Sequence, residues 1–362
     1  MQIQSNIQVG IMAKGADRHS WNAIVLSNPH KTPYHLWEFG QALSSTYGYE
    51  KYNFVAKYKG EVIGLFPLLF VKSRLFGNKL LSLPFCEYGG PLIDSTCDFS
   101  WQVIKVLLKE IFLSAKNLDV DYIEVRNPFS FGEVLSAEGF HVSKKYVTFG
   151  IDLSKGKEHL WRALDKKTRN STRKGMKNNL DIRKIQNEAD LKDYFYLYLK
   201  TQKKHGSPPH DFKLFQNLFR LNSENSMNLF IAKYRKRPIA GVIVFYDGTK
   251  MYWWGGVSDP QFKNLNASDV LLWTLIEWGI EKGFLGFDLG RTRRSTTVYH
   301  FKKGWGGVET PLLDYVFSLK SINSFTPDPT EGKYQVLTRL WSHLPMALTK
   351  SVGPKIAKNI GL

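Results

Sequence analysis

Two stretches of the chain share an order of residues: Phe54-Val-Ala-Lys-Tyr-Lys-Gly-Glu-Val-Ile-Gly64 and Phe230-Ile-Ala-Lys-Tyr-Arg-Lys-Arg-Pro-Ile-Ala-Gly241. In each, an apolar run enters a short basic turn and leaves it through a second apolar run, which extends to Val71 or to Tyr246. An apolar run, a tight turn and a second apolar run predict a β-hairpin. We therefore expect two β-hairpins of the same kind, one in each half of the chain.

The segments that follow the two hairpins also correspond. Each hairpin is followed by more strand, then an amphipathic helix with apolar residues at i, i+3, i+4 and i+7, then a strand and a last strand. The helices are expected at Trp101–Leu113 and Val270–Lys282, the strands at Val120–Val125 and Gly283–Leu289, and the last strands at 145–153 and 311–319.

A repeat of this length predicts two copies of one domain. The fold class is α/β (α+β): two tandem domains, each with a mixed, mostly antiparallel sheet flanked by helices. The expected domains are residues 1–153, residues 154–325, which open with a basic helical segment, and a basic C-terminal tail at 326–362.

Composition excludes several classes of protein. The 362 residues are 43% hydrophobic and 14% aromatic, which excludes intrinsic disorder, and two cysteines are too few for a disulfide scaffold. The longest apolar run, Val62–Val71, is too short to span a bilayer, and the N-terminal residues lack a signal-peptide pattern. We expect a cytoplasmic protein; a peripheral position at the inner face of the membrane is the alternative.

The formal charge of +18 is concentrated in two segments. Residues 155–184 hold eleven Lys or Arg and three acids, and residues 331–362 hold five Lys or Arg and one acid. Lys166, Arg169 and Arg173 recur at spacings of three and four, so they share a helical face, and Lys174 follows them. This row indicates a polyanionic partner, with tRNA, nucleotide phosphates or an anionic membrane as candidates, or a solvated helix face.

Helices are expected at Glu158–Asn179, which carries this row, and at Glu188–Lys204. The segment Leu337–Ile360 mixes apolar and basic residues, so it could rest on an anionic membrane or pack against the domain.

Several motifs together resemble the FemAB-like transferases over roughly residues 20–320. They are Lys166-Lys-Thr-Arg-Asn-Ser-Thr-Arg-Lys-Gly, Lys204-His-Gly-Ser-Pro-Pro, Trp253-Trp-Gly-Gly, Asn266-Ala-Ser-Asp-Val-Leu-Leu-Trp, Phe287-Asp-Leu-Gly-Arg and His300-Phe-Lys-Lys-Gly-Trp-Gly. Two further segments, around Tyr88-Gly-Gly-Pro and Trp341-Ser-His-Leu-Pro, resemble a branch associated with exopolysaccharide systems. The resemblance implies tandem GNAT-like domains and acyl transfer to an amine. The best-known members transfer an amino acid from aminoacyl-tRNA to a peptidoglycan precursor.

The resemblance also suggests catalytic residues. Phe301-Lys302 looks like the Phe-Lys pair of the family's catalytic motif, and Lys302 would stabilise the oxyanion that forms during acyl transfer. Asp288 follows a buried strand and is either a general base or a structural partner of Arg291 or Arg293. His300 is a second candidate for the general base, and proton transfer assisted by the substrate would need neither residue.

Substrate-binding candidates lie around these residues. Arg291 and Arg293 follow a strand and could clamp a phosphate or carboxylate, while Trp253 could line a groove. His205, beside a Gly-Ser-Pro-Pro loop, and Asn266, in the family block, complete the candidates. His205, His210 and Asp211 do not make a metal-ligand pattern, so we expect no metal.

The turn Asp259–Asp269 bears on the donor. Acyl-CoA enzymes of the GNAT type usually hold pyrophosphate on a glycine-rich turn at a helix N-terminus, but this turn contains no glycine. The expected donor is therefore aminoacyl-tRNA, with no cofactor, and the acceptor is an envelope precursor, which a lipid could carry. The alternatives are an acyl-CoA-dependent N-acyltransferase acting on an amino sugar or peptide, and a non-catalytic nucleic-acid-binding module.

Overall fold

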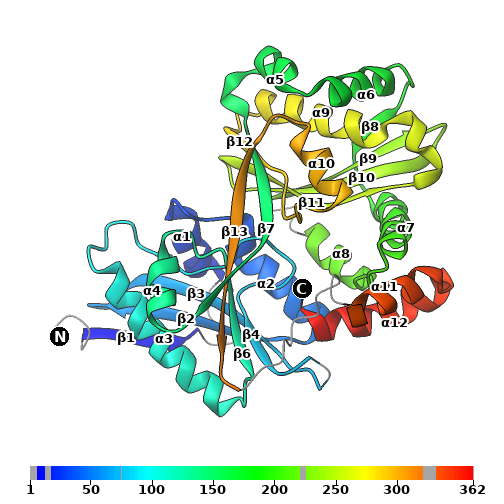
Figure 1. Cartoon of the computed structure of the whole chain (residues 1–362). Helices are drawn as coiled ribbons and strands as arrows, with labels where there is room; N and C mark the ends of the chain where they lie inside the picture. Colours follow the sequence, from blue (N-terminus) through cyan, green and yellow to red (C-terminus); the bar gives the residue numbers. More distant parts are fainter. Residues whose placement is uncertain (1–5, 13–17, 75, 221–225, 321–331, 362) are drawn as a thin grey trace. The chain divides into compact units, whose positions relative to one another are not determined.

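The computed structural model describes residues 6–12, 18–74, 76–220, 226–320 and 332–361. The chain forms two compact units (Figure 1). Unit 1 comprises Met1–Lys145, Leu312–Pro327 and Ile356–Leu362, and unit 2 comprises Tyr146–Pro311 and Asp328–Lys355. The units are therefore interleaved along the chain, and their limits differ from the expected domains 1–153, 154–325 and 326–362.

Unit 1 is built on a sheet in which the first predicted hairpin is confirmed. β2 and β3 pair antiparallel from Glu50 with Phe70 to Tyr58 with Glu61, and the turn residues Lys59 and Gly60 both have positive φ. That backbone conformation matches the twist of a two-residue hairpin. The order is β1-β2-β3-β4-β6-β13, with β5 paired to β3, and β4 lies parallel to β6. The strands are β1 (Ile7–Ile11), β2 (Glu50–Tyr58), β3 (Glu61–Val71), β4 (Lys79–Leu81), β5 (Leu92–Ile93), β6 (Tyr122–Arg126) and β13 (Val308–Ser318).

The core of unit 1 lies between this sheet and α3 (Ser100–Asn117), the first predicted amphipathic helix. Its buried side chains recur at helical spacing, from Val103 and Ile104 to Leu107, Leu108 and Ile111. The remaining helices of this unit are α1 (Arg18–Ser27), α2 (Trp37–Tyr47) and α4 (Gly132–Ala137), with short 3-10 turns η2 (Pro33–His35) and η3 (Phe129–Phe131).

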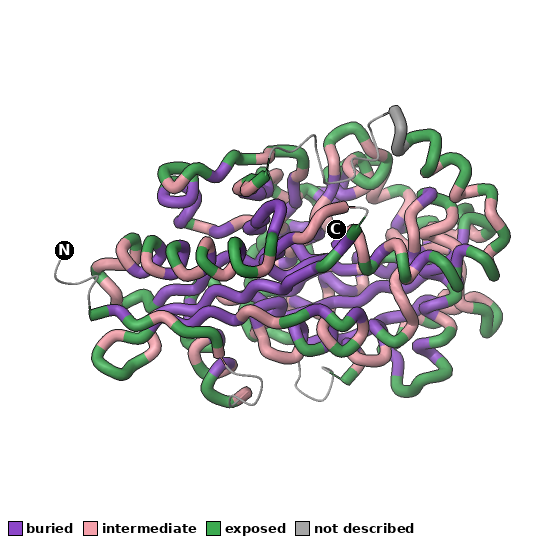
Figure 2. The backbone as a smooth tube through the Cα atoms, turned by 90° about the horizontal axis from the view of Figure 1, so that it is seen from below, coloured by how far each residue is buried: buried purple, intermediate pink, exposed green. Residues whose placement is uncertain are grey.

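Unit 2 repeats the arrangement around the second predicted hairpin. β9 pairs antiparallel with β10, and the turn residues Arg235 and Lys236 again have positive φ. The order is β7-β12-β11-β10-β9-β8, with β11 parallel to β12. The strands are β7 (His141–Asp152), β8 (Asp181–Lys184), β9 (Met227–Tyr234), β10 (Arg237–Tyr246), β11 (Lys250–Ser258) and β12 (Gly286–Asp288). The residues of β3, β4 and β6 in unit 1 and of β9 and β10 in unit 2 are mostly buried, and the buried positions follow the strands in Figure 2.

The last strands of the two copies are exchanged. β7 follows the first copy in the chain, but its residues 150–152 pair with β12 in unit 2. β13 follows the second copy, but its residues 314–318 pair with β6 in unit 1. The predicted strands 145–153 and 311–319 are confirmed as strands, but each belongs to the sheet of the other copy, and this exchange interleaves the units.

Helices cover both faces of the sheet in unit 2. α9 (Ala267–Glu281), the second predicted amphipathic helix, packs on the face that carries Val242 and Val244. α7 (Glu188–His205) and α8 (Phe212–Phe219) lie on the other face, where Phe215 contacts Trp254 of β11. The remaining helices are α5 (Lys157–Ala163), α6 (Lys166–Met176), α10 (Thr297–Lys303), α11 (Gly332–His343) and α12 (Met346–Ile360), with 3-10 turns η4 (Leu153–Lys155) and η6 (Pro260–Leu265); the residues of α12 from Ile356 onward belong to unit 1.

The prediction of a single helix over Glu158–Asn179 is wrong in one respect, because the structure divides this segment into α5 and α6. Asp165 adopts an extended conformation between them, and its carboxylate accepts a hydrogen bond from the Thr168 amide. An aspartate in this position caps a helix N-terminus, which starts a new helix at Lys166. The prediction of Glu188–Lys204 as a helix is confirmed by α7. No helix in the described part of the chain is both long enough and apolar enough to cross a membrane.

Candidate functional site

The loop between β12 and α10 gathers four of the predicted residues in unit 2. Asp288 ends β12, and its carboxylate accepts hydrogen bonds from the Thr148 hydroxyl on β7 and from the Gly290 amide, the latter at 2.7 Å. Because β12 is parallel to β11, the loop leaves the carboxyl edge of a parallel pair. In open α/β sheets, ligands bind at such an edge.

Lys302 of α10 closes this loop from the other side. Its side chain is buried, and Nζ donates to the carbonyl oxygens of Gly290 at 2.7 Å and Arg291 at 3.0 Å. Carbonyl oxygens offset the cost of burying an ammonium group, so the cation has a fixed position. The neighbouring Phe301 points into the core, where its ring lies 6.1 Å from that of Trp305. A fixed cation is one kind of group that can stabilise a developing oxyanion.

Arg291 and Arg293 meet on the ring of Tyr146. The guanidinium carbon of Arg291 lies 4.1 Å from the ring centroid and that of Arg293 lies 5.0 Å away. Arg293 also donates from Nη2 to the Tyr146 hydroxyl at 3.1 Å. Stacking on an aromatic face orients the planar guanidinium group. Tyr146 was not among the predicted residues, because nothing in its sequence context shows that Arg293, 147 positions later, will contact it.

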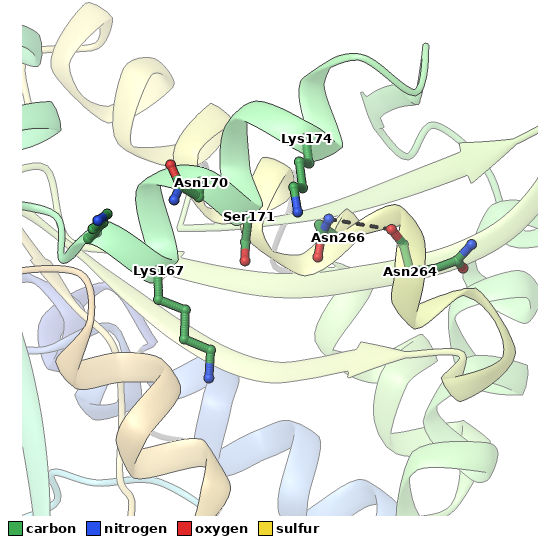
Figure 3. A pocket seen from close by; sticks show the side chains of 7 residues that line it. Lys167, Asn170, Ser171, Lys174, Asn264 and Asn266 are labelled. Atoms are coloured by element: carbon green, nitrogen blue, oxygen red, sulfur yellow. Dashed lines mark hydrogen bonds between the residues drawn. The ribbon is translucent and has the colours of Figure 1, made fainter.

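A pocket of about 650 Å³ forms a second candidate region in unit 2 (Figure 3). It lies between α6 and the segment that leads into α9, and in Figure 3 Ser171 and Lys174 face Asn266 at the start of α9. The first amides of a helix carry a positive partial charge, which adds to the charge of the lysines. The lining residues are Lys166, Lys167, Asn170, Ser171, Lys174, Asn264 and Asn266.

The backbone around Asn266 explains how this turn forms without glycine. Asn266 occupies the N-cap position of α9 with a left-handed φ of 51°, a conformation that asparagine tolerates better than most residues. Its side chain does not cap the helix; instead Nδ2 donates to the Asn264 carbonyl at 3.4 Å. The helix N-terminus is thus not closed by the side chain of its own cap residue, which suits an anionic ligand.

Close packing holds α6 against this end of α9. A Cβ atom at Gly175 would lie 2.4 Å from Val270 Cγ2 and 3.1 Å from the Asn266 carbonyl oxygen, and the neighbouring Thr172 is fully buried. Only glycine permits this approach. Gly175 therefore sets the distance between α9 and α6, the helix that carries the pocket lysines.

The predicted basic row of α6 is divided between two sides of the helix. Lys166 and Lys174 line the pocket. Arg173 lies over the ring of Trp161, 5.6 Å from its centroid, and Arg169 donates to the Arg162 carbonyl at 3.5 Å. The three residues predicted to share a helical face are therefore divided: Lys166 lines the pocket with Lys174, whereas Arg169 and Arg173 lie beside α5.

An acidic residue that the sequence analysis missed lies near the pocket. Burial raises the pKa of Asp269, in the first turn of α9, to about 6; the charge of Asp165 adds to this rise and the charge of Lys167 opposes it. A carboxyl group that titrates near pH 6 beside a lysine-lined pocket would make the binding of an anion there sensitive to pH.

The remaining predicted residues lie on separate elements. Trp253 of β11 packs against the core and its ring lies 6.4 Å from that of Phe287. His205 is the last residue of α7, and burial, followed by the charge of Lys204, lowers its pKa. Among the residues that the structure describes, no group of three or more His, Cys, Asp or Glu side chains could hold a metal ion.

Comparison with known proteins agrees with this architecture. Residues 165–303 match the family model of the acetyltransferase (GNAT) domain, and this range contains both the pocket and Lys302. No curated protein matches the chain in sequence.

Solved structures share the fold over most of the chain. FemX superposes with a TM-score of 0.68 at 16% identity, covering 93% of this chain and 100% of FemX. A tandem GNAT protein from the clavulanic acid biosynthesis pathway superposes with a TM-score of 0.59 at 9% identity, covering 88% and 100%. L-PGS from Bacillus licheniformis gives 0.56 at 13% identity, covering 91% and 98%. The predicted α/β fold and its resemblance to FemAB-like proteins are thus confirmed at the level of the fold: residues 165–303 match a GNAT domain, and the whole chain shares its fold with FemX and with a tandem GNAT protein.

Proposed function

We propose that this protein is a FemAB-like transferase that moves an aminoacyl group from aminoacyl-tRNA onto an amine of a cell-envelope precursor, peptidoglycan-like or polysaccharide. The observation that carries the proposal is the position of Lys302 in a GNAT domain. Its ammonium group is held between two carbonyl oxygens of the loop that leaves the parallel pair β11–β12. A fixed positive charge at the reacting carbonyl would stabilise the oxyanion that acyl transfer to an amine forms.

The reaction assigns a task to each group in the loop. The acceptor amine attacks the ester carbonyl carbon of the aminoacyl-tRNA, so that a C–N bond forms and the carbonyl oxygen becomes an oxyanion. Lys302 stabilises this oxyanion. The C–O bond to the ribose then breaks, and the ribose oxygen leaves with a proton that the amine releases. The bonds formed and broken in this reaction balance without an oxidant, a metal or a further reactant.

Asp288 fits a positioning role in this scheme. Its carboxylate accepts from the Gly290 amide, and the Gly290 carbonyl accepts from Lys302, so Asp288 and Lys302 hold the same residue from two sides. In the positioning role, Asp288 maintains the loop and the proton passes between the substrates. In the alternative role, Asp288 accepts the proton as a general base.

The pocket between α6 and α9 supports an anionic donor. It has three lysines and the start of a 15-residue helix, and RNA phosphates suit such a surface. The same feature favours one further candidate, an acyl-CoA-dependent N-acyltransferase, because a helix N-terminus also binds pyrophosphate. The turn of Asp259–Asp269 lacks the glycines usual in that class, which is why we place aminoacyl-tRNA first.

A transfer assay with a labelled acyl group tests the proposal. The protein is incubated with a mixture of aminoacyl-tRNAs or with acetyl-CoA, together with amine-bearing envelope precursors, and the product is detected by mass spectrometry. We expect transfer from aminoacyl-tRNA, reduced about 100-fold or more by Lys302→Met. Lys303→Met, at the exposed neighbouring lysine, is the matched control and should retain the wild-type rate.

Three results would contradict parts of the proposal. Transfer from acetyl-CoA but not from aminoacyl-tRNA would show that the donor is an acyl-CoA. Tight RNA binding with no transfer from any donor would favour the nucleic-acid-binding module. A wild-type rate in Lys302→Met would show that Lys302 does not stabilise the oxyanion.

A further inference from the structure

The C-terminal helices of unit 2 expose large apolar side chains. In α11, Val336, Leu337 and Leu340 are 60%, 58% and 61% exposed. In α12, Leu348 and Val352 are 45% and 37% exposed. Single exposed apolar residues are common on proteins, but five within seventeen residues indicate an interaction surface.

The orientation of α11 accounts for this exposure. α11 packs against α7, and Thr338 lies against Gly206, which follows α7: a Cβ atom at Gly206 would lie 2.2 Å from the Thr338 carbonyl oxygen. Val336, Leu337 and Leu340 occupy positions i, i+1 and i+4 of the same helix, so they share a face. In α3 the apolar face is buried against the sheet, whereas in α11 the apolar face remains turned to solvent.

Leu348 and Val352 continue this pattern in the next helix. They are spaced i and i+4, so they share one face of α12, and Lys355 follows one turn later on the same side. Both helices are thus amphipathic with an exposed apolar side.

The charge of this segment selects one kind of partner. From Gly332 to Ile360 the sequence contains no aspartate or glutamate and five basic residues. Arg339, Lys350 and Lys355 are among its exposed residues. An apolar face on a segment whose own charged residues are all basic is complementary to a bilayer with anionic headgroups, because acyl chains accept the apolar side chains and phosphates accept the basic ones.

We propose that α11 and α12 form a membrane-docking face by which the protein binds reversibly to the surface of an anionic lipid bilayer. Val336, Leu337, Leu340, Leu348 and Val352 enter the boundary between headgroups and acyl chains. The surrounding Lys and Arg side chains contact lipid phosphates. This inference rests on exposure and charge alone, and it holds whether or not the chain transfers an aminoacyl group.

Vesicle co-sedimentation of the full chain tests the docking face. Vesicles of phosphatidylcholine alone are compared with vesicles in which a third of the lipid is phosphatidylglycerol, at low and at physiological salt. We expect binding to the anionic vesicles, weakened by salt, and at least about tenfold weaker binding to neutral vesicles. The double variant Leu337→Ser/Leu340→Ser should reduce binding about tenfold or more.

Matched variants separate the apolar and the charged contributions. Leu285→Ser removes a side chain that is 56% exposed outside the segment, and it should bind like the wild type. Arg339→Gln/Lys350→Gln should weaken binding to anionic vesicles and flatten its salt dependence, whereas Lys236→Gln in the exposed turn after β9 should not. Circular dichroism confirms that each variant is folded.

Two results would overturn the proposal. The first is that the wild-type protein stays in the supernatant with anionic vesicles at low salt. The second is that Leu337→Ser/Leu340→Ser binds these vesicles as tightly as the wild type. If light scattering shows a dimer that this double variant dissociates, the face joins two copies of the chain instead. Transfer to a water-soluble acceptor should be unchanged in the double variant, so failure of docking and failure of transfer are distinguishable.

Discussion

The Nζ atom of Lys302 lies 2.7 Å from the carbonyl oxygen of Gly290, so this side chain of α10 is hydrogen-bonded to the loop that follows β12. A second hydrogen bond, to the Arg291 carbonyl at 3.0 Å, fixes the ammonium group in two directions. Lys302 therefore makes a local structural contact and also carries the positive charge to which we assign the oxyanion in the proposed transfer. Variants of this residue must separate the two roles.

Lys302→Met should lower both stability and activity. Loss of the ammonium group leaves two carbonyl oxygens without their donor, at a cost of about 1–3 kcal/mol in the free energy of unfolding. Urea unfolding followed by circular dichroism measures this change. Lys302→Arg keeps the charge, so it should retain more stability than Lys302→Met. Equal transfer by Lys302→Met and Lys303→Met at matched folded fractions would assign Lys302 a structural role only.

Asp288→Asn tests whether this carboxylate positions the loop or accepts a proton. The asparagine oxygen can still accept from Thr148 and Gly290, so we expect transfer to fall about tenfold or less, with the shape of its pH profile unchanged. The measurement is the initial rate of transfer from pH 5 to pH 9. Loss of the acidic limb of the profile in Asp288→Asn would instead identify Asp288 as the general base.

Substitution of the pocket lysines should weaken the binding of RNA. Lys166→Gln/Lys174→Gln removes two positive charges from the pocket, so tRNA affinity should fall and the slope of log Kd against log salt should decrease by about one per lysine. Filter binding across a salt series gives both quantities. Lys236→Gln, outside the pocket, should change neither. An unchanged slope in the double variant would exclude phosphate contacts in this pocket.

Gly175→Ala should displace α6 from α9. The added Cβ would lie 2.4 Å from Val270 Cγ2, a contact that must be relieved by movement of the helix, with a loss of about 1–3 kcal/mol in the free energy of unfolding. Gly40→Ala, in α2, is the control, since a Cβ there meets nothing within 4 Å and alanine favours a helix. Equal melting temperatures for wild type and Gly175→Ala would show that α6 adjusts without cost.

Asp269 should make pocket occupancy depend on pH. Its pKa of about 6 lies above the ordinary value of 3.8, so the carboxyl becomes charged as pH rises through 6 and then opposes an anion in the pocket. Inorganic pyrophosphate should bind more tightly at pH 5.5 than at pH 7.5, and Asp269→Asn should remove most of that difference. Isothermal titration calorimetry at the two pH values measures the effect. An equal difference in wild type and Asp269→Asn would assign it to another group.

The same raised pKa has a consequence for stability. In the native state Asp269 keeps its proton up to about pH 6, whereas in the unfolded state it loses the proton near pH 4. Its contribution to stability is therefore present below pH 4 and is lost as pH rises toward and through 6. Asp269→Asn should accordingly unfold at a higher urea concentration than the wild type at pH 7.5, and the gain should disappear near pH 4.

Local sequence determined the elements of this protein. The apolar run, basic turn and apolar run from Phe54 and from Phe230 contain the whole information for a hairpin, because the residues that pair lie within a few positions of the turn. The spacing of apolar residues in α3 and α9 likewise predicts their buried faces. The break between α5 and α6 was also readable in principle, since Asp165 three residues before Thr168 is a helix-start signal.

The tertiary structure decided which elements meet. An alternating strand pattern shows that a segment pairs, but it does not name the partner; only the structure shows that β7 joins β12 and β13 joins β6. The meeting of Tyr146 with Arg293, and of α6 with the start of α9, has the same origin. Residues far apart in the chain are brought together by packing and by backbone hydrogen bonds between strands. The sequence by itself therefore determined the repeated elements and their apolar faces, while the exchange of strands and the surroundings of Lys302 came from the fold.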